Sequence, residues 1–409
     1  MGIIVQKFGG TSVGTVDRIQ HVASRVIQEK ENGNHVVVVV SAMGKSTDKL
    51  VDLANQITSK PSKREMDMLL TTGEQVTISL LTMALQEKGY EATSFTGWQA
   101  GIETEAKHGN ARITKIDPDH IKDELSEGKI VVVAGFQGVS VEDEITTLGR
   151  GGSDTTAVAL AAALKAEKCD IYTDVTGVFT TDPRVVKSAR KLAAISYDEM
   201  LELANLGAGV LHPRAVEYAK NYNVPLEVRS SMEKERGTII EEETKMEQNL
   251  VVRGIAFEDQ VTRVSVLGIP NELSTLSTIF STLAKSGLNV DIIIQSTTSD
   301  QKTSISFSVK TADLEDTIAI LVQHKATLNY AKIESESGLS KVSIVGSGMV
   351  SNPGVAAEMF EVLANEGIEI KMVSTSEIKV STVISQEHMV TAVDILHQAF
   401  DLSKVTAIV

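Results

Sequence analysis

The chain has 409 residues, of which 42% are hydrophobic and 23% are charged, so a mainly disordered chain is excluded. Acidic residues outnumber basic ones by 54 to 39, which gives a net charge of −15. No basic patch stands out, and duplex nucleic acid, which is bound through dense Lys and Arg, is therefore not expected as a partner. At about 150 residues per domain, the length predicts two or three domains.

Cysteine content and apolar runs predict a cytoplasmic protein with no membrane partner. The single cysteine, Cys169, permits no internal disulfide and no cysteine-based zinc site, as is usual in a reducing compartment. The apolar run at residues 3–5 is too short for a signal peptide. The run at 36–40 falls far below the ~20 residues of a membrane span. The eight histidines show no metal-ligand spacing, so no resident metal site is expected.

The first part of the chain alternates short apolar runs with helical patterns. Residues 3–5 and 36–40 are uninterrupted apolar runs, which suit parallel strands covered on both faces. Between them, apolar residues recur at helical spacing over 19–27, with Asp17 as the expected N-cap and Asn32-Gly33 as the stop. This is the pattern of a βαβ unit. Further strands are predicted at 130–133, 170–173 and 226–228, and an Ala-rich helix at 155–168.

An acidic, polar run at 241–249 is predicted to be a linker, beyond which the chain repeats itself. Residues 264–268 (Val-Ser-Val-Leu-Gly) resemble 342–346 (Val-Ser-Ile-Val-Gly). Each copy is predicted as strand, helix, strand, strand, helix, strand, which is the ferredoxin-like plan. Such repeats are expected to be regulatory, to mediate dimerisation, or both. The predicted domains are a first domain at 1–240, a linker at 241–260, and repeats at 261–338 and 339–409.

Two glycine-rich loops carry the candidate chemistry. The first, at 7–14, places Gly9 and Gly10 after the first strand, where backbone N–H groups and a helix N-terminus can approach a phosphate. Lys7 would add a cation there. The loop matches neither the Walker A pattern nor the dinucleotide fingerprint, so a purely structural turn is the alternative.

The second loop, at 148–156, combines glycines, an arginine and the start of the Ala-rich helix. The planar fork of Arg150 matches a carboxylate in bidentate fashion. Asp154 has two possible roles. It either caps the helix, or it orients Lys7 and organises charge around a transferring phosphoryl group.

Together these motifs resemble those of aspartate kinases, and the repeats resemble the paired ACT domains of those enzymes. The agreement is collinear along the whole chain, and several long motifs in one order make chance negligible. The matching segments are Lys-Phe-Gly-Gly-Thr-Ser (7–12), Val-Ser-Ala-Met-Gly (40–44), Thr-Thr-Gly-Glu (71–74), Gly-Arg-Gly-Gly-Ser-Asp-Thr (149–155), Tyr-Thr-Asp-Val-Thr-Gly-Val-Phe-Thr-Thr-Asp-Pro-Arg (172–184) and Val-Leu-His-Pro-Arg (210–214).

The resemblance implies an α/β amino-acid-kinase fold, a carbamate-kinase-like αβα sandwich with a mostly parallel sheet, followed by two ferredoxin-like ACT domains. It implies transfer of the γ-phosphoryl group of Mg²⁺-bound ATP to the β-carboxylate of L-aspartate. The product, 4-phospho-L-aspartate, leads to lysine, threonine, methionine and diaminopimelate. Because the acceptor carboxylate is already ionised at neutral pH, catalysis is expected to rest on positioning and charge stabilisation.

The resemblance also assigns site residues. Lys7 and Asp154 are the catalytic candidates, Glu74 is expected to receive the substrate ammonium, and Arg150 a substrate carboxylate. The substrate-binding candidates are Ser41, Thr47, Glu74, Arg150, Gly151, Gly152 and Ser153. The nucleotide-binding candidates are Lys7, Gly9, Gly10, Thr173, Asp174, Phe179, Thr180, Thr181, Asp182, Pro183 and Arg184.

Two parts of the sequence stand apart from this assignment. Related enzymes usually carry Gly-Ala-Lys before the Val-Leu-His-Pro-Arg segment, whereas this chain has Gly-Ala-Gly ending at Gly209. A nucleotide contact from that lysine is therefore missing. His108 lies in a His-Gly-Asn-Ala-Arg segment that resembles the family but has no assigned role. His212 is expected to be a structural loop residue.

ACT domains imply feedback regulation by an amino acid, here lysine, threonine or both, and a homo-oligomer formed through these domains. The Pro-Gly of the family's first effector loop is present at 353–354 but replaced by Pro-Asn at 270–271. Met246 is either an ordinary linker residue or an internal start for a shorter subunit. The effector-site candidates are Asn271, Asn289, Val290, Asp291, Gln295, Val355, Ala356, Glu369, Ile370, Ser376 and Glu377.

Two other functions fit parts of the sequence. The same fold could phosphorylate another acceptor, as acetylglutamate and glutamate kinases do, although those enzymes lack paired ACT repeats. Alternatively, the chain could be a catalytically inactive ACT-type amino-acid sensor. The intact Lys7, Asp154 and glycine loops argue against an inactive protein.

Overall fold

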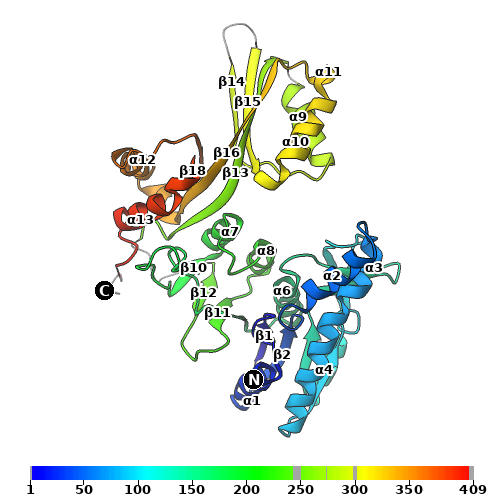
Figure 1. The fold of residues 1–409 in the computed structure, drawn as a ribbon. Helices are drawn as coiled ribbons and strands as arrows, with labels where there is room; N and C mark the ends of the chain where they lie inside the picture. Colours follow the sequence, from blue (N-terminus) through cyan, green and yellow to red (C-terminus); the bar gives the residue numbers. More distant parts are fainter. Residues whose placement is uncertain (1, 243–249, 273, 298–301, 405–409) are drawn as a thin grey trace. The chain divides into compact units, whose positions relative to one another are not determined.

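The computed structural model describes residues 2–242, 250–272, 274–297 and 302–404. They form two compact units, shown in Figure 1. The first is built from residues 2–179 and 191–242, and the second from residues 180–190 and 250–404. Met246 and the other residues at 243–249 of the predicted linker lie outside the described residues.

The first unit is organised around an eight-stranded sheet with the order β10-β12-β11-β9-β1-β2-β6-β3, in which every neighbouring pair is parallel except β11 and β12. The valine-rich runs at its centre are buried on both faces, as a parallel sheet covered by helices requires. The mostly parallel α/β fold is therefore confirmed. The strands are β1 (Ile3–Phe8), β2 (His35–Val40), β3 (Ala92–Phe95), β6 (Ile130–Ala134), β9 (Lys168–Thr173), β10 (Ala194–Ser196), β11 (Leu226–Ser230) and β12 (Thr238–Glu241).

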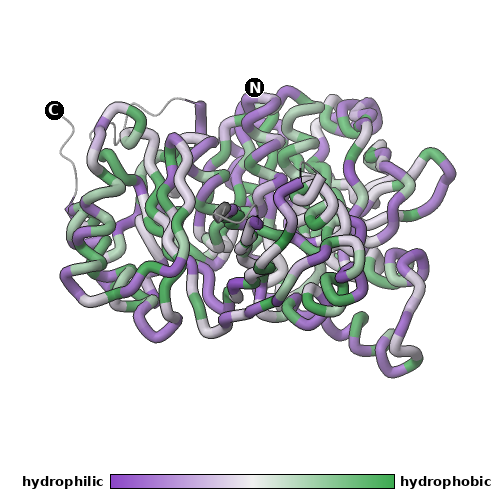
Figure 2. The backbone as a smooth tube through the Cα atoms, turned by 90° about the horizontal axis from the view of Figure 1, so that it is seen from above, coloured by the Kyte–Doolittle hydropathy of each residue, from purple (hydrophilic) through white to green (hydrophobic). Residues whose placement is uncertain are grey.

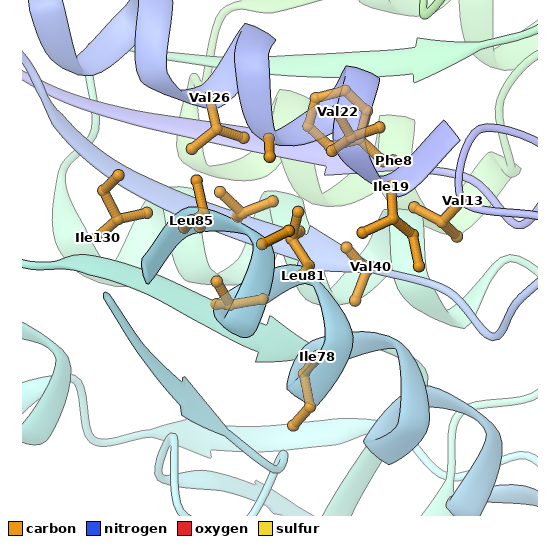
Figure 3. Packing of buried hydrophobic residues seen from close by; sticks show 14 of the residues in the cluster. Phe8, Val13, Ile19, Val22, Val26, Val40, Ile78, Leu81, Leu85 and Ile130 are labelled. Carbon is orange, nitrogen blue, oxygen red and sulfur yellow. The ribbon is translucent and has the colours of Figure 1, made fainter. Parts of the chain in front are cut away.

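Helices α1 and α4 supply much of the core of this unit (Figure 3). Val22 and Val26 of α1, and Leu81 and Leu85 of α4, pack in one cluster with the valines of β2. The helices are α1 (Val16–Glu31), α2 (Ser46–Ile57), α3 (Lys63–Leu70), α4 (Thr72–Glu87), α5 (Asp119–Ser126), α6 (Gly152–Leu164), α7 (Tyr197–Asn205) and α8 (Pro213–Tyr222).

A four-stranded sheet in the order β5-β4-β7-β8 comprises β4 (Ile102–Thr104), β5 (Ile113–Ile116), β7 (Gln137–Ser140) and β8 (Ile145–Thr147).

Two helix starts differ from the sequence prediction. The N-cap of α1 is Thr15, whose hydroxyl accepts the N–H of Arg18, so Asp17 lies in the first turn instead of capping the helix. Helix α6 begins at Gly152, three residues earlier than predicted, because Gly151 takes the left-handed conformation at the N-cap. Left-handed Lys165 then ends α6, and the chain enters β9 at Lys168.

Among the described residues, one helical stretch, Lys63–Glu87, is long and apolar enough to cross a membrane by length and composition. It consists of α3 and α4, and half of its apolar window is buried inside the protein. Leu81 and Leu85 have no exposed surface, so this is a helix pair of the core.

The second unit contains a six-stranded antiparallel sheet with the order β14-β15-β13-β16-β18-β17. Its strands are β13 (Gly254–Pro270), β14 (Ile293–Thr297), β15 (Lys302–Lys310), β16 (Lys332–Val345), β17 (Met372–Thr375) and β18 (Lys379–Ser385). Its helices are α9 (Thr275–Lys285), α10 (Leu314–Gln323), α11 (Lys325–Leu328), α12 (Val355–Asn365) and α13 (Met389–Ala399). Three 3₁₀ turns complete it: η1 (Thr311–Asp313), η2 (Ser347–Ser351) and η3 (Gln386–His388).

The two long strands β13 and β16 pair with each other over two stretches and lie at the centre of the six-stranded sheet (Figure 1). Residues 254–258 of β13 pair with 341–345 of β16, whereas 261–267 pair with 332–339. The strand therefore begins inside the range 241–260 that the sequence assigns to a linker. Its first residues, 254–256, are buried in succession and so lack the alternation of a half-buried strand, and acidic residues flank them on both sides.

Residues 180–190 belong to the second unit although the sequence places them in the first domain. Val186 is buried in the core cluster of the second repeat, and the hydroxyl of Thr180 lies 2.9 Å from Nε2 of the buried His397 on α13. The backbone N–H of Ile255 also donates to the carbonyl of Thr180.

The hydropathy colouring in Figure 2 shows that short hydrophobic stretches alternate with hydrophilic ones along the chain. This alternation is expected of helices and strands that each bury one face in a core and expose the other.

Candidate active site

An ion pair joins the end of β1 to the start of α6. The Nζ atom of Lys7 lies 2.6 Å from Oδ1 of Asp154, and the two side chains are only 11% and 12% exposed. Asp154 is in the first turn of α6, whereas the N-cap position is taken by Gly151, which makes no side-chain cap. Of the two roles predicted for Asp154, this geometry favours the one in which it orients Lys7.

The loops that follow β1 and β2 are bonded to each other beside this ion pair. The N–H of Gly44 donates to the carbonyl of Gly10 at 2.9 Å, and the N–H of Ser41 to that of Phe8 at 3.1 Å. A Cβ at Gly10 would lie 2.8 Å from the carbonyl oxygen of Ala42, so a larger residue would push these loops apart. A Cβ at Gly9 would lie 3.4 Å from Nζ of Lys7, which puts the Gly9 backbone next to the ammonium.

Glu74 is a buried carboxylate that is tied to the same pair of loops. It lies in the first turn of α4 and is 3% exposed. Its Oε1 accepts the N–H of Ala42 at 3.0 Å, whereas its buried Oε2 has no hydrogen-bond partner among the described residues. Burial raises the pKa of Glu74 to about 7, and the hydrogen bond from Ala42 opposes that rise. An unsatisfied buried carboxylate oxygen favours a cationic ligand.

The loop that carries Arg150 is held in an unusual backbone conformation. Gly149 and Gly151 have φ values of +77° and +67°, which only glycine adopts without strain. A Cβ at Gly151 would lie 2.2 Å from Cβ of His212, so the loop also passes too close to α8 for any side chain. The imidazole of His212 accepts the N–H of Arg214 at the N-cap of α8, which is a structural role. Arg150 is exposed.

The remaining substrate candidates flank these groups. Ser41 and Thr47 are half-buried, Ser41 directly after β2 and Thr47 in the first turn of α2. Ser153 is 8% exposed in α6, and a Cβ at Gly135 would lie 2.7 Å from its Cβ. Lys7 at the end of β1, Ser41 after β2, Glu74 in the first turn of α4 and Asp154 in the first turn of α6 are therefore linked through the hydrogen-bonded loops after β1 and β2 and the Lys7–Asp154 ion pair. This is the edge of a parallel sheet where ligands usually bind.

The predicted nucleotide-binding stretch is divided between the two units. Thr173, Asp174 and Phe179 belong to the first, where the hydroxyl of Thr173 donates to the carboxylate of Asp174 at 3.0 Å. The residues from Thr180 to Arg184 belong to the second.

Inside the second unit, much of this stretch is already bonded. The Thr180 hydroxyl lies beside His397 and accepts the N–H of Arg190. Hydrogen bonds from Arg184 lower the pKa of Asp182. Nothing lies within 4 Å of a Cβ built at Gly209, so a lysine would fit at that position.

One buried residue escapes the sequence prediction. Asp67 on α3 is fully buried and accepts hydrogen bonds from His108, Gly109 and Thr147. In the sequence it stands between two methionines in a polar helix, and no feature there distinguishes it from an acid exposed to solvent. The one sequence signal for this region was the His-Gly-Asn segment at 108–110, whose His108 and Gly109 contact Asp67.

Comparison with known proteins identifies the family. A family model described as the amino acid kinase family matches residues 2–230, and an ACT domain model matches 264–324 and 342–400. An aspartokinase of Bacillus sp. (strain MGA3) is 75% identical over 403 residues, covering 98% of each chain. The chain belongs to the aspartokinases of the amino acid kinase family. Aspartokinase 2 of Bacillus subtilis (strain 168) is 74% identical over 404 residues, covering 99% of each chain.

A solved aspartokinase structure supports the same family and fold. The crystal structure of E. coli aspartokinase III in complex with aspartate and ADP matches with a TM-score of 0.81 at 28% identity, covering 97% of this chain and 99% of that one. These matches confirm the predicted amino-acid-kinase fold with ACT domains, and the predicted kinase activity of the aspartokinase family.

The burial of Glu74 predicts a pH-dependent cost in stability. Because its pKa is raised from 4.5 to about 7, the folded state holds a proton that the unfolded state loses in this window, and stability falls as pH rises through it. Glu74→Gln should therefore raise the free energy of unfolding by about 1–3 kcal/mol at pH 8 and change it little at pH 4. Urea unfolding at both pH values measures this. Glu87→Gln, exposed at the end of the same helix, is the control. Equal effects of Glu74→Gln at both pH values would contradict the argument.

Proposed function

We propose that this aspartokinase-family enzyme transfers the γ-phosphoryl group of ATP to the β-carboxylate of L-aspartate, forming 4-phospho-L-aspartate for lysine, threonine, methionine and diaminopimelate synthesis. The observation that carries the proposal is the buried Lys7–Asp154 pair, which joins the end of β1 to the start of α6. The loop after β1 is hydrogen-bonded to the loop after β2, where Ala42 donates to Glu74, whose other carboxylate oxygen is unsatisfied. A cation for a phosphoryl group and an anion for an amino group are thereby available at one edge of the sheet.

Aspartate recognition in this proposal uses two opposite charges. Glu74 receives the ammonium group, and Arg150 receives a carboxylate as a bidentate fork. The ammonium also stabilises the charged form of Glu74, so the burial cost described above is offset when the substrate binds. Ser41, Thr47 and the backbone at 151–153 complete the contacts. A related enzyme, E. coli aspartokinase III, has been crystallised with aspartate and ADP, which supports these two ligands.

The chemistry requires two anions to meet, and no strong base is needed because the acceptor is already ionised. Lys7 and the N-terminus of α6 supply positive charge at the transferring group. Among the described residues, no group of three or more His, Cys, Asp or Glu could hold a metal ion. Mg²⁺ is therefore proposed to arrive bound to ATP, where it neutralises phosphate charge.

The nucleotide contacts in this proposal follow the order of the chain. Lys7, Gly9 and Gly10 hold the phosphates in this proposal, with Thr173, Asp174 and Phe179 of the same unit as further nucleotide contacts. The assignment of the stretch 180–184, which belongs to the second unit, stays a prediction from the sequence. The backbone of Gly9 next to Nζ of Lys7 supports the phosphate end. Thr180 has little left to offer a nucleotide, because its hydroxyl is engaged by His397 and Arg190, its N–H donates to the carbonyl of Arg190, and its carbonyl accepts the N–H of Ile255.

Removing the Lys7 cation tests the catalytic assignment. Lys7→Ala should lower kcat by roughly 10²–10³-fold, the usual scale for the loss of one electrostatic stabiliser. The measurement is aspartate-dependent ADP release with ATP and Mg²⁺, on protein whose fold is checked by circular dichroism. Lys30→Ala, in the last turn of α1, is the control cation. Near-normal turnover in Lys7→Ala would defeat the assignment.

Removing the Arg150 guanidinium tests the substrate clamp. Arg150→Ala should raise the KM for aspartate at least tenfold and leave the KM for ATP nearly unchanged, because the contact is made to the amino acid alone. Arg150→Lys keeps the charge without the fork and should give an intermediate value. An aspartate KM equal to that of the unchanged enzyme would count against the clamp.

Regulation by an end-product amino acid is proposed for the ACT unit, with lysine, threonine or both as effectors. The related E. coli aspartokinase III has also been crystallised with lysine and aspartate, and that structure matches with a TM-score of 0.77 at 28% identity. Asp291 is the proposed partner of the effector ammonium. In this structure its carboxylate pairs with buried Lys341, which also lies 2.9 Å from Glu258. An effector would therefore have to compete with Lys341.

The other proposed effector residues differ in accessibility. Asn271, Asn289, Gln295, Glu369, Ser376 and Glu377 are exposed, Val290, Ala356 and Ile370 are half-buried, and Val355 is buried in the core of the second repeat. The exposed polar residues are the better candidates for direct contact. A homo-oligomer through the ACT domains, a shorter subunit from Met246, and a cytoplasmic location without nucleic-acid or membrane partners complete the proposal.

One assay tests both activity and regulation. ADP release should depend on aspartate, and N-acetylglutamate or glutamate should not replace it. Lysine, threonine or their mixture should inhibit it, because an effector acts by binding one global state better than the other. Asp291→Asn should raise the effector concentration needed for half inhibition without changing the uninhibited rate. Full activity at millimolar concentrations of both amino acids would overturn the regulatory proposal.

A further inference from the structure

Asp67 is a buried acid whose hydrogen bonds all lead toward the loop that carries Arg150. It is fully buried on α3, and its carboxylate accepts the Thr147 hydroxyl at 2.6 Å and the N–H of Gly109 at 3.0 and 3.1 Å. The Nδ1 atom of His108 lies 2.9 Å from its Oδ2. A carboxylate buried with this many donors holds each of them in a fixed place.

Thr147 is the last residue of β8 and stands directly before the loop at 148–151. Its side chain is bonded to Asp67, and its carbonyl accepts the N–H of Ala111 at 2.9 Å. The next residue, Leu148, donates its N–H to the carbonyl of Phe136 at 2.9 Å. The chain therefore enters the Arg150 loop from an anchored residue.

The segment at 108–111 supports the same loop from another side. A Cβ at Gly149 would lie 2.8 Å from Oδ1 of Asn110, so the loop rests directly on that side chain. Arg214 joins the two parts, because it donates to Oδ1 of Asn110 at 2.6 Å and to the carbonyl of Leu148 at 3.0 Å. Asp67 fixes this segment through Gly109 and His108.

We propose that Asp67 is a positioning residue for aspartate binding, acting through Thr147 and His108 to hold the 148–151 loop so that Arg150 presents its guanidinium to the substrate. The inference rests on the proposed role of Arg150. It gives the His108 segment a role: His108 and Gly109 are the donors through which Asp67 anchors that segment, and Asn110 is its contact with the loop.

Thr147 gives the sharpest test, because valine has the same shape without the hydroxyl. Thr147→Val should raise the KM for aspartate about tenfold and leave the KM for ATP and the kcat at saturating aspartate within about twofold. Thr147→Ser, which keeps the donor, should restore the aspartate KM to near the original value. A structural defect alone would lower kcat and affect both substrates.

Asp67→Asn is the second variant, because the amide replaces one acceptor oxygen by a donor that faces other donors. It should raise the aspartate KM at least as much as Thr147→Val. Glu65→Gln is the matched control, since Glu65 is an exposed acid on the same helix. His108→Asn keeps a donor near the Nδ1 position and should be milder than His108→Ala. If Asp67→Asn fails to fold, the Thr147 pair decides the question.

A double substitution separates this inference from the proposed function. In an Arg150→Ala background, Thr147→Val should raise the aspartate KM by less than twofold, because the loop no longer presents a ligand. An equal increase in both backgrounds would overturn the positioning role, as would an unchanged aspartate KM in Thr147→Val. If Arg150→Ala itself leaves the aspartate KM unchanged, the clamp fails, and the positioning role fails with it for that separate reason.

Discussion

The buried ion pair between Lys7 and Asp154 is the interaction on which the rest of the site depends. A lysine ammonium at the end of a central strand loses much of its hydration, and a carboxylate at 2.6 Å compensates for that loss. The pair also joins β1 to α6, so the two glycine loops cannot move apart without breaking it. In the proposed mechanism, the pair fixes positive charge in advance at the position that receives the phosphoryl group, which is how such reactions are accelerated.

Close backbone contact is the second constraint. Gly10 against Ala42 and Gly151 against His212 leave no room for a Cβ, and a Cβ at Gly73 would lie only 2.8 Å from that of Ala42. Glu74 follows Gly73 directly and is buried beside Ala42, and its Oε2 has no hydrogen-bond partner among the described residues. Burying this carboxylate carries an electrostatic cost, which a cationic group bound beside it would offset.

Much of the fold followed from the sequence, as did the positions of the two glycine loops proposed for the site, because valine runs and glycine loops are local signals. The strands at 36–40 and 130–133 and the Lys7 and Arg150 loops are of this kind. Three features did not follow from the sequence. Thr15 caps α1 in place of Asp17 because cap geometry depends on the backbone. Asp67 is buried only because β8 and the 108–111 segment close over it. The residues 180–190 join the second unit through contacts with α13, some two hundred positions along the chain.

The sharing of β13 and β16 between the repeats has a consequence for how this regulatory unit can evolve and be dissected. Residues 254–258 precede the first repeat in sequence but complete the sheet of the second, where they pair with 341–345. Cutting the polypeptide between the repeats would thus strip the downstream half of one strand and expose a hydrogen-bonding edge. The two halves therefore form a single fold built on one continuous sheet.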